Sequence, residues 1–403
     1  MKTVLGPFAD ANAAGHPIQT PLPWTLMAFA SRVLGQSLLG GSPTAGSATG
    51  AAPTSETVSA ATAAGPSMNG APKTSVTVSE PSEPVFTGRP SISTQIFVAA
   101  LRLLNPVFKL LGVDPGGSSA SIPFVSDGIP PFFVTYGLKV ASSEYDGWKV
   151  WTLTPARPTG QVVVGVHGGG FVMQASIFHW MAYADMARAT GATVVVPQYP
   201  LAKTDGTGGT AATVVPVMAD FIADQVAAHG ANNVSVIGDS AGGTIALAAA
   251  QMLVQQCGTD LKCRARVLPG HLVLVSPALD SGLSNPDAAK IDDPLLNVAR
   301  SQRNGKLWAA GLGTPEDPDG TKNPLASPLY GSLEGLPPTT VYAGSLDLRT
   351  PDVLVLQQRA AATPGADFSF ELRNGMVHDW TFLPFLSDAI AARPSIYQHL
   401  GLR

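Results

Sequence analysis

Short hydrophobic runs and helical stretches alternate along the chain from about residue 134 onward. The runs are rich in Val, Ile and Leu, as expected for strands that are covered on both faces. This alternation predicts a mostly parallel sheet with right-handed crossovers. The predicted strands are Tyr136–Val140, Trp148–Thr154, Gln161–Val166, Thr193–Pro197, Val234–Ile237, Leu272–Val275, Thr339–Tyr342 and Phe368–Leu372. The most evident predicted helices are Val214–Ala228, Thr244–Gln256 and Thr350–Ala361.

Two further segments could lie over a site. Apolar residues recur at helical spacing from Ile92 to Leu111, and Pro106 is expected to kink or divide this helix. Packing on its own domain is the favoured interpretation, since most such stripes face a core. A lid, or peripheral lipid contact through 92–111, is the alternative. Residues 281–335, rich in Pro, Asn and Asp, are predicted to form a cap-like excursion between strands.

The N-terminal part of the chain follows a different pattern. Residues 23–39 form one short amphipathic stretch, which cannot make a domain by itself. Residues 40–84 are dominated by Ala, Gly, Ser, Thr and Pro and cannot bury enough surface to offset their ordering entropy. The prediction is therefore an N-terminal segment, 1–39, a disordered linker, and a domain over 85–403 whose residues 85–133 supply cap or lid helices.

Composition narrows the function classes. Hydrophobic residues make up 45% of the 403 and charged residues 13%, so a sizeable core is possible. A net charge of −4 offers no broad basic surface for a nucleic-acid backbone, so no nucleic-acid partner is expected. The sequence contains no uninterrupted run of about 18 apolar residues, so a transmembrane helix is not expected. The apolar stretch after Met1 is too short for a signal peptide.

Localisation stays open between export, the cell envelope and the cytoplasm. Pro23-Trp24 followed by a helix resembles, without specificity, a segment near the start of exported mycobacterial proteins. The two cysteines, Cys257 and Cys263, lie between a predicted helix and a predicted strand. They form either a short-loop disulfide, which their closeness favours, or two free thiols. No histidine adjoins them, so no zinc site is expected there.

The segment Gly238–Gly243, with the sequence GDSAGG, follows a predicted strand and precedes a predicted helix. This strand–turn–helix context is typical of a nucleophile elbow, whereas a glycine-rich turn with an inert serine is the alternative. Ser240 is therefore the predicted nucleophile. The backbone N–H of Ala241 is expected to face an oxyanion at the positive end of the helix.

A second glycine-rich motif ends the predicted strand before it. Three glycines after His167 let backbone N–H groups approach a developing negative charge without obstruction. Gly168, Gly169 and Gly170 are predicted to form the oxyanion hole together with Ala241. Gly169 and Gly170 are the preferred donors, and Gly168 shapes the loop. The His167 ring is expected to anchor this loop rather than to act as the base.

The base and the acid are expected on loops that follow the last two strands. His378 lies after the final strand and is the predicted base. Asp347 lies just past the preceding strand and is the predicted acid, with Asp352 as a rival that more naturally serves a helix dipole. Asp379 is expected to be a solvated or loop-bracing carboxylate. His179 is among the histidines expected at the surface or packed inside. The order serine, aspartate, histidine is the one that α/β hydrolases use.

Over residues 130–400 the chain resembles the hormone-sensitive-lipase-like branch of the α/β hydrolases. His167–Phe171 matches its HGGGF motif, Gly238–Gly243 its GDSAGG motif, and Gly375–His378 its glycine-to-histidine loop. The resemblance implies an α/β-hydrolase fold: a mostly parallel eight-stranded sheet flanked by helices, with a helical cap. That family's cap is N-terminal, which suits residues 91–130.

The resemblance also assigns supporting residues. It implies that Asp239 supports the elbow and that Tyr199 corresponds to a tyrosine of the family's YRLAPE segment. The chain departs from the family where Pro200 replaces Arg, and where Leu348 replaces the proline that usually follows the acid. Neither change touches the predicted triad.

The activity that these residues predict is hydrolysis of carboxylic esters, by a carboxylesterase or lipase that forms an acyl-enzyme and needs no cofactor. The expected substrate is a small-molecule or lipid ester, and the sequence does not set the oligomeric state. A serine amidase or acyltransferase with the same triad is one alternative. A non-catalytic binding module with this fold is another.

Overall fold

The computed structural model describes residues 85–110 and 125–402. The helix expected within 23–39, the linker over 40–84 and residues 111–124 of the predicted cap lie outside the described residues. The strands are β1 (Leu138–Tyr145), β2 (Trp148–Pro155), β3 (Val162–Val166), β4 (Thr193–Gln198), β5 (Val234–Asp239), β6 (His271–Val275), β7 (Thr339–Gly344) and β8 (Phe368–Arg373).

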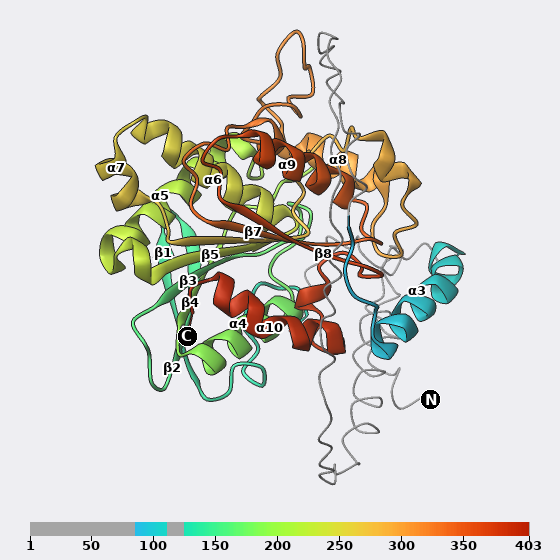
Figure 1. Ribbon diagram of the computed structural model, residues 1–403, viewed down its shortest axis with the longest axis horizontal. Coiled ribbons are helices and arrows are strands. Elements are labelled where there is room, and N and C mark those ends of the chain that lie inside the picture. The colour runs from blue at the N-terminus through green and yellow to red at the C-terminus, as the bar shows by residue number, and fades with distance from the viewer. Residues whose placement is uncertain (1–84, 111–124, 403) are drawn as a thin grey trace, which may run out of the picture.

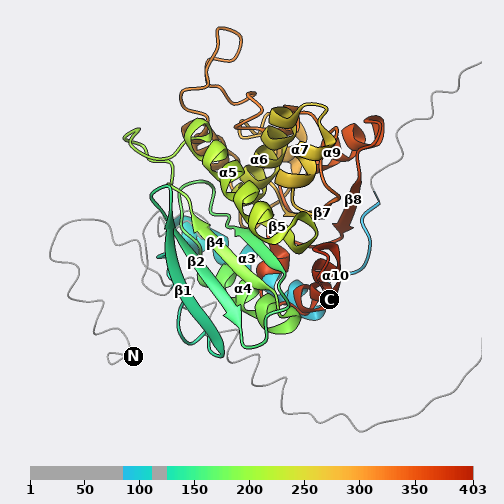
Figure 2. The ribbon, with the colours of Figure 1, turned by 90° about the vertical axis from the view of Figure 1, so that its left-hand side faces the viewer.

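The eight strands form one sheet in the order β1-β2-β4-β3-β5-β6-β7-β8 (Figure 1). β2 runs antiparallel to both β1 and β4, and the strands from β4 to β8 are parallel to one another. The sheet twists from the β1–β2 edge to β8 (Figure 2). Because β3, β5, β6, β7 and β8 are parallel, their carboxyl ends meet at one edge, where ligands bind in such sheets.

Helices cover both faces of the sheet. The α-helices are α3 (Ile92–Leu110), α4 (Ile177–Thr190), α5 (Ala211–His229), α6 (Ala241–Cys257), α7 (Leu261–Val267), α8 (Val298–Trp308), α9 (Thr350–Ala362) and α10 (Ser387–His399). Short 3-10 helices span Ala231–Asn233, Pro286–Lys290, Pro328–Tyr330 and Trp380–Phe382. Helices α5, α6 and α9 lie over one face, and α4 and α10 lie over the other (Figure 1). The α/β-hydrolase fold expected from the sequence is confirmed.

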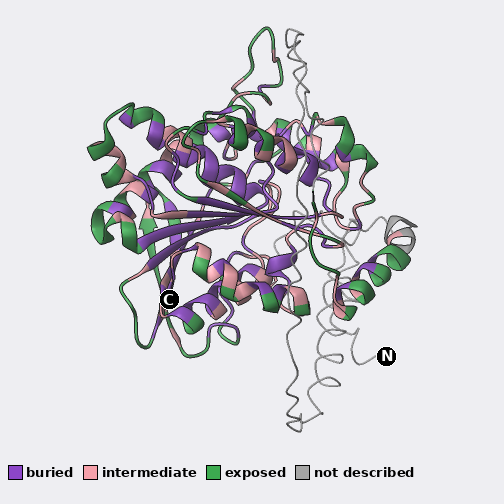
Figure 3. Cartoon of the chain, in the orientation of Figure 1, coloured by how far each residue is buried: buried purple, intermediate pink, exposed green. Residues whose placement is uncertain are grey.

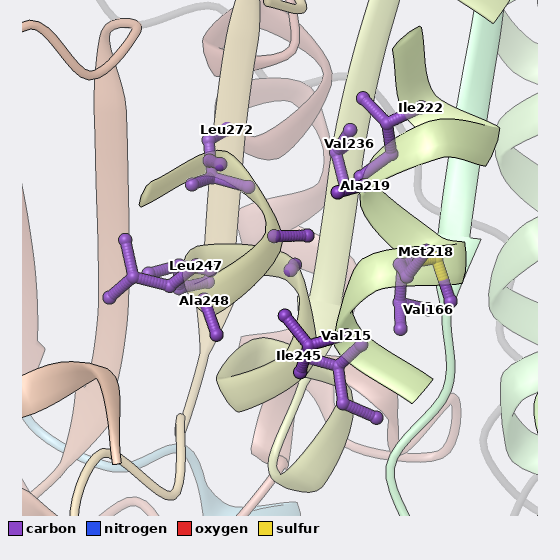
Figure 4. Packing of buried hydrophobic residues seen from close by; sticks show 14 of the residues in the cluster. Val166, Val215, Met218, Ala219, Ile222, Val236, Ile245, Leu247, Ala248 and Leu272 are labelled. Atoms are coloured by element: carbon purple, nitrogen blue, oxygen red, sulfur yellow. The ribbon is translucent and has the colours of Figure 1, made fainter. Parts of the chain in front are cut away.

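The core consists of the two layers between the sheet and its helices, and the central strands are buried along their length (Figure 3). On one side Val166 and Val236 of the sheet meet Met218 of α5 and Ile245 of α6 (Figure 4). Full burial of each such side chain contributes roughly 1.5–3 kcal/mol. This packing fixes α6, and with it the turn from which α6 starts.

Helix α5 is, among the described residues, the one helix long and apolar enough by length and composition to cross a membrane. Eight of its residues are buried, including Val214, Met218 and Ile222. Their side chains pack on the sheet and on α6 (Figure 4). The apolar character of α5 is therefore accounted for by the core.

Two local features differ from what the sequence pattern predicts. The first strand begins at Leu138 and runs to Tyr145, beyond the predicted end at Val140. It is an edge strand whose residues are mostly exposed, so the hydrophobic pattern does not mark its end. Pro106 does not divide α3, which runs unbroken from Ile92 to Leu110.

Cys257 and Cys263 form a disulfide that joins the end of α6 to α7. We expect a Cys257→Ala/Cys263→Ala variant to lose about 2 kcal/mol of unfolding free energy, because the loop that the bond closes is short. Turnover should be unchanged, since the bond lies at the far end of α6, about 25 Å from Ser240. Denaturant melts and ester-hydrolysis rates measure both quantities.

Wild-type protein treated with a reductant is the control, and it should shift by the same amount. A loss of turnover at unchanged stability would contradict this view of the bond as a purely structural connection.

Candidate active site

Ser240 occupies the sharp turn between the end of β5 and the start of α6. Its backbone angles, φ 49° and ψ −117°, lie outside the usual regions for a residue with a side chain. The Ser240 N–H donates to the carbonyl oxygen of Val275 at the end of β6, at 2.8 Å. A side chain at Gly242 would overlap the carbonyl oxygen of Val166, so the close approach of α6 to β3 requires glycine there. The sequence thus folds locally into the elbow that exposes a serine hydroxyl.

Three side chains from separate strand ends meet at this turn. His378 Nε2 lies 2.9 Å from Ser240 Oγ, and His378 Nδ1 lies 3.0 Å from Asp347 Oδ2. Ser240 and His378 are each 7% exposed, and Asp347 is fully buried. The three residues of the predicted triad therefore form one continuous line of hydrogen bonds.

The environment of Asp347 keeps its carboxylate charged. Burial by itself would raise the pKa of Asp347, but the facing His378 holds that pKa below its usual value. The backbone N–H of Arg349, at 2.8 Å from Oδ1, and the Ser276 hydroxyl act in the same direction. A charged Asp347 can accept the Nδ1 proton and so fix the tautomer of the imidazole.

The departure from the family pattern after the acid has a local explanation. The Leu348 N–H donates to Oδ2 of Asp293 at 3.0 Å, a bond that a proline in this position could not make. Asp293 belongs to the excursion over 281–335 and is half-buried. The sequence reasoning missed Asp293, because nothing in its neighbourhood marks it as a partner of a residue 55 positions away.

The glycine loop after β3 lies beside the elbow. The Gly168 N–H donates to Asp239 Oδ2 at 3.0 Å. Of the residues assigned to the oxyanion hole, Gly168 shapes the loop and is not a donor, because its N–H already serves a buried carboxylate. Within the described part of the chain, the N–H groups of Gly169, Gly170 and Ala241 donate no hydrogen bond. These three groups are free to bind a negatively charged oxygen.

His167 and Tyr199 hold the base of this loop. Their rings stack with centroids 4.4 Å apart. The Tyr199 hydroxyl donates to the His167 carbonyl oxygen, and His167 Nδ1 donates to the Gly168 carbonyl oxygen, both at 2.8 Å. Burial lowers the pKa of His167 to about 4, so its ring is neutral. Both side chains are thus occupied in shaping the loop.

His179 is a site residue whose role was not foreseen. Its Nε2 lies 2.9 Å from Asp239 Oδ2, and its Nδ1 accepts from the Ser176 N–H at 2.9 Å. Burial acts to lower the pKa of His179, but Asp239 raises it above its ordinary value. The pair connects α4 to the elbow, and it places Asp239 to receive the Gly168 N–H. The spacing of Ser176 and His179 at the start of α4 is a capping-box signal, but it does not identify Asp239.

The excursion over 281–335 packs against the glycine loop. Trp308 of α8 stacks on Phe171, with ring centroids 4.5 Å apart. Asn304, one turn earlier, lies beside Gly170. This segment therefore lies next to the free N–H groups.

Two further carboxylates lie near the triad. Asp352 is buried in the first turn of α9, where the sequence placed it. Asp379 was expected to be a solvated or loop-bracing carboxylate, but its Oδ2 lies 3.1 Å from His378 Nε2. Within 85–110 and 125–402, no group of three or more His, Cys, Asp or Glu residues could hold a metal ion.

Comparisons with known proteins indicate one fold family. A family model described as the alpha/beta hydrolase fold matches residues 163–382. A triacylglycerol lipase of Mycobacterium tuberculosis is 40% identical over 334 residues, which cover 79% of this chain and 67% of that protein. An acetyl-hydrolase of Streptomyces hygroscopicus is 31% identical over 231 residues, which cover 56% of this chain and 70% of that protein.

Solved structures show the same fold. A crystal structure of an esterase from the bacterial hormone-sensitive lipase family covers 78% of this chain and 98% of its own, with a TM-score of 0.59 and 24% identity. An esterase/lipase from an uncultured bacterium covers 77% of this chain and 98% of its own, with a TM-score of 0.60 and 21% identity. Since the family model matches more than half of the sequence, this chain belongs to the alpha/beta hydrolase fold family.

Proposed function

We propose that this chain is a serine ester hydrolase with Ser240 as the nucleophile, His378 as the base and Asp347 as the acid that orients the base. The observation that carries the proposal is the hydrogen-bonded line from Asp347 through His378 to Ser240. It ends at a strained turn beside three backbone N–H groups without an acceptor in the described structure. A serine hydroxyl needs both a base and such donors to attack a carbonyl carbon.

The first half of the reaction forms an acyl-enzyme. Ser240 Oγ bonds to the ester carbonyl carbon while its proton passes to His378 Nε2. The electron pair of the carbonyl bond moves onto oxygen, which the N–H groups of Gly169, Gly170 and Ala241 stabilise. The charged Asp347 stabilises the imidazolium that forms. His378 then returns its proton to the departing alkoxide, and the alcohol leaves.

The second half releases the acid. A water molecule gives a proton to His378 Nε2 as its oxygen attacks the acyl carbon. The tetrahedral intermediate collapses, the bond to Ser240 Oγ breaks, and the serine regains its proton from the imidazolium. Ser240 and His378 thus account for every proton transfer in the two half-reactions.

The substrate class is a carboxylic ester. The relatives named triacylglycerol lipase and acetyl-hydrolase support esters and leave the acyl length open. We also propose that α3 contacts the surface of a lipid aggregate. This contact is supported by outward apolar side chains on that helix, where Ile92 is 75%, Ile96 51% and Leu103 77% exposed.

The test is the rate on a series of p-nitrophenyl esters from acetate to palmitate, together with labelling by a fluorophosphonate probe. We expect turnover on part of this series and covalent labelling at Ser240. A folded protein that neither labels nor turns over any ester would favour the binding-module alternative. Product analysis with an added alcohol or amine separates hydrolysis from acyl transfer.

A further inference from the structure

Asp379 contacts the reactive nitrogen of the base. Its Oδ2 lies 3.1 Å from His378 Nε2, the same atom that faces Ser240 Oγ at 2.9 Å. The backbone fixes this position, because Asp379 has a left-handed φ of 52° and its N–H donates to Ser276 Oγ at 3.0 Å. Its carbonyl oxygen accepts from the Phe382 N–H at 2.9 Å. The carboxylate is thus held where the proton of the reaction must pass.

We propose that Asp379 is a positioning residue that acts on His378 Nε2 and sets the pH at which Ser240 can be activated. This inference rests on the proposed function, since it concerns the same base. Asp347 orients the ring from Nδ1, and Asp379 adds a second carboxylate at the opposite nitrogen. The imidazolium is therefore held between two negative charges.

The two carboxylates that contact His378 both favour its protonated form. Burial acts to lower the pKa of His378, but Asp347 and Asp379 together raise it well above its ordinary value. Asp293, which accepts the N–H of Leu348 next to Asp347, adds a further negative charge when ionised. Asp239, which is paired with His179, acts on Asp379 and raises the pKa of that carboxyl.

The pKa of Asp379 is also raised above the ordinary value of a carboxyl. Burial raises the pKa of its carboxyl to about 6, although His378 opposes that rise. About a quarter of the side chain is exposed, with 23% of its surface accessible, so solvent screens part of the interaction. The negative charge of Asp379 therefore raises the pKa of His378 most strongly above about pH 6.

The sign of the effect follows from the mechanism. A protonated Nε2 has no lone pair to accept the Ser240 proton, so turnover rises as pH rises through the pKa of His378. The carboxylate of Asp379 stabilises the protonated form and moves that rise to higher pH. The same carboxylate strengthens His378 as a base once the proton has left. Neutralising Asp379 must therefore shift the rise of turnover on the acid side of the pH profile, its acid limb, to lower pH.

The test is an Asp379→Asn variant, because asparagine keeps the size of the side chain and tolerates the left-handed backbone. We expect the acid limb of kcat/KM on a p-nitrophenyl ester to move down by about one pH unit or more, as for loss of a charge in contact. A Glu316→Gln variant, which removes one charge from an exposed loop, should leave the limb in place. An unmoved limb in Asp379→Asn would overturn the inference.

A second measurement does not depend on turnover. The titration of His378 can be followed by NMR in Ser240→Ala and in Ser240→Ala/Asp379→Asn, both labelled at histidine nitrogen. We expect a lower pKa of His378 in the double variant, and equal values would reject the role of Asp379. Failure of the proposed function would show differently, as ester hydrolysis that survives in Ser240→Ala itself.

Discussion

Replacing Ser240 with alanine should lower kcat for ester hydrolysis by about 10⁴-fold or more, with little change in the melting temperature. The reason is that the attacking oxygen disappears, while His378 and the free N–H groups stay where they are. The turn should tolerate alanine, since serine and alanine both carry a Cβ and meet the same strain at φ 49°. Stopped-flow hydrolysis of a p-nitrophenyl ester and a thermal melt measure the two quantities.

The matched control is Ser143→Ala, which removes an exposed hydroxyl from edge strand β1. That variant should keep full turnover and fluorophosphonate labelling, whereas Ser240→Ala should lose both. Weak residual hydrolysis in Ser240→Ala is compatible with catalysis by the N–H groups alone. Turnover close to that of the wild type would require another nucleophile and would overturn the assignment.

The sheet could be predicted well because its strands carry their own signal. Seven of the eight strands agree with the sequence prediction to within two residues at each end. Buried parallel strands are short runs of β-branched residues, and this pattern depends on no distant partner. The exception is β1, where Ser142, Ser143 and Glu144 extend an exposed edge that hydrogen bonds to β2 stabilise. No hydrophobic alternation can reveal such an extension.

The start of α6 shows how tertiary contacts override local preference. The sequence places this helix from Thr244, because Gly242 and Gly243 disfavour helix. The structure begins it at Ala241, directly after the nucleophile. Both glycines pack against neighbouring backbone or proline, a contact that any side chain would disturb. The low helix propensity of glycine is offset here, because only glycine lets α6 approach β3 this closely.

The triad could be proposed from chain order, but the contacts that support it could not. The order of serine, aspartate and histidine relative to the strands is visible in the sequence, since each follows a strand end. Two contacts, Asp239 with His179 and Asp379 with His378, form only because the tertiary fold places their side chains next to each other. Neither bond belongs to a motif that spans both partners. The sequence therefore identifies the reacting groups and misses what surrounds them.

The acid assignment gives the second large effect. Asp347→Asn should lower kcat by about 10⁴-fold, because the asparagine amide would face His378 Nδ1 with a donor. The ring would then carry its proton on Nε2 and could not accept one from Ser240. Asp352→Asn should stay at least about 100-fold more active than Asp347→Asn. Burial raises the pKa of Asp352 to about 7, so the neutral amide resembles a form that this carboxyl already adopts.

Rates on one p-nitrophenyl ester, measured for both variants at the plateau of the pH profile, decide between the two carboxylates. Asp352 lies in the first turn of α9 beside Arg349 and serves as the matched buried control. Thermal melts of both variants separate damage to the fold from damage to the chemistry. Equal losses of turnover in two folded variants would mean that Asp347 does not orient His378 through Nδ1. The hydrogen bond of 3.0 Å between them would then be structural, and the acid would have to be sought among the neighbouring carboxylates.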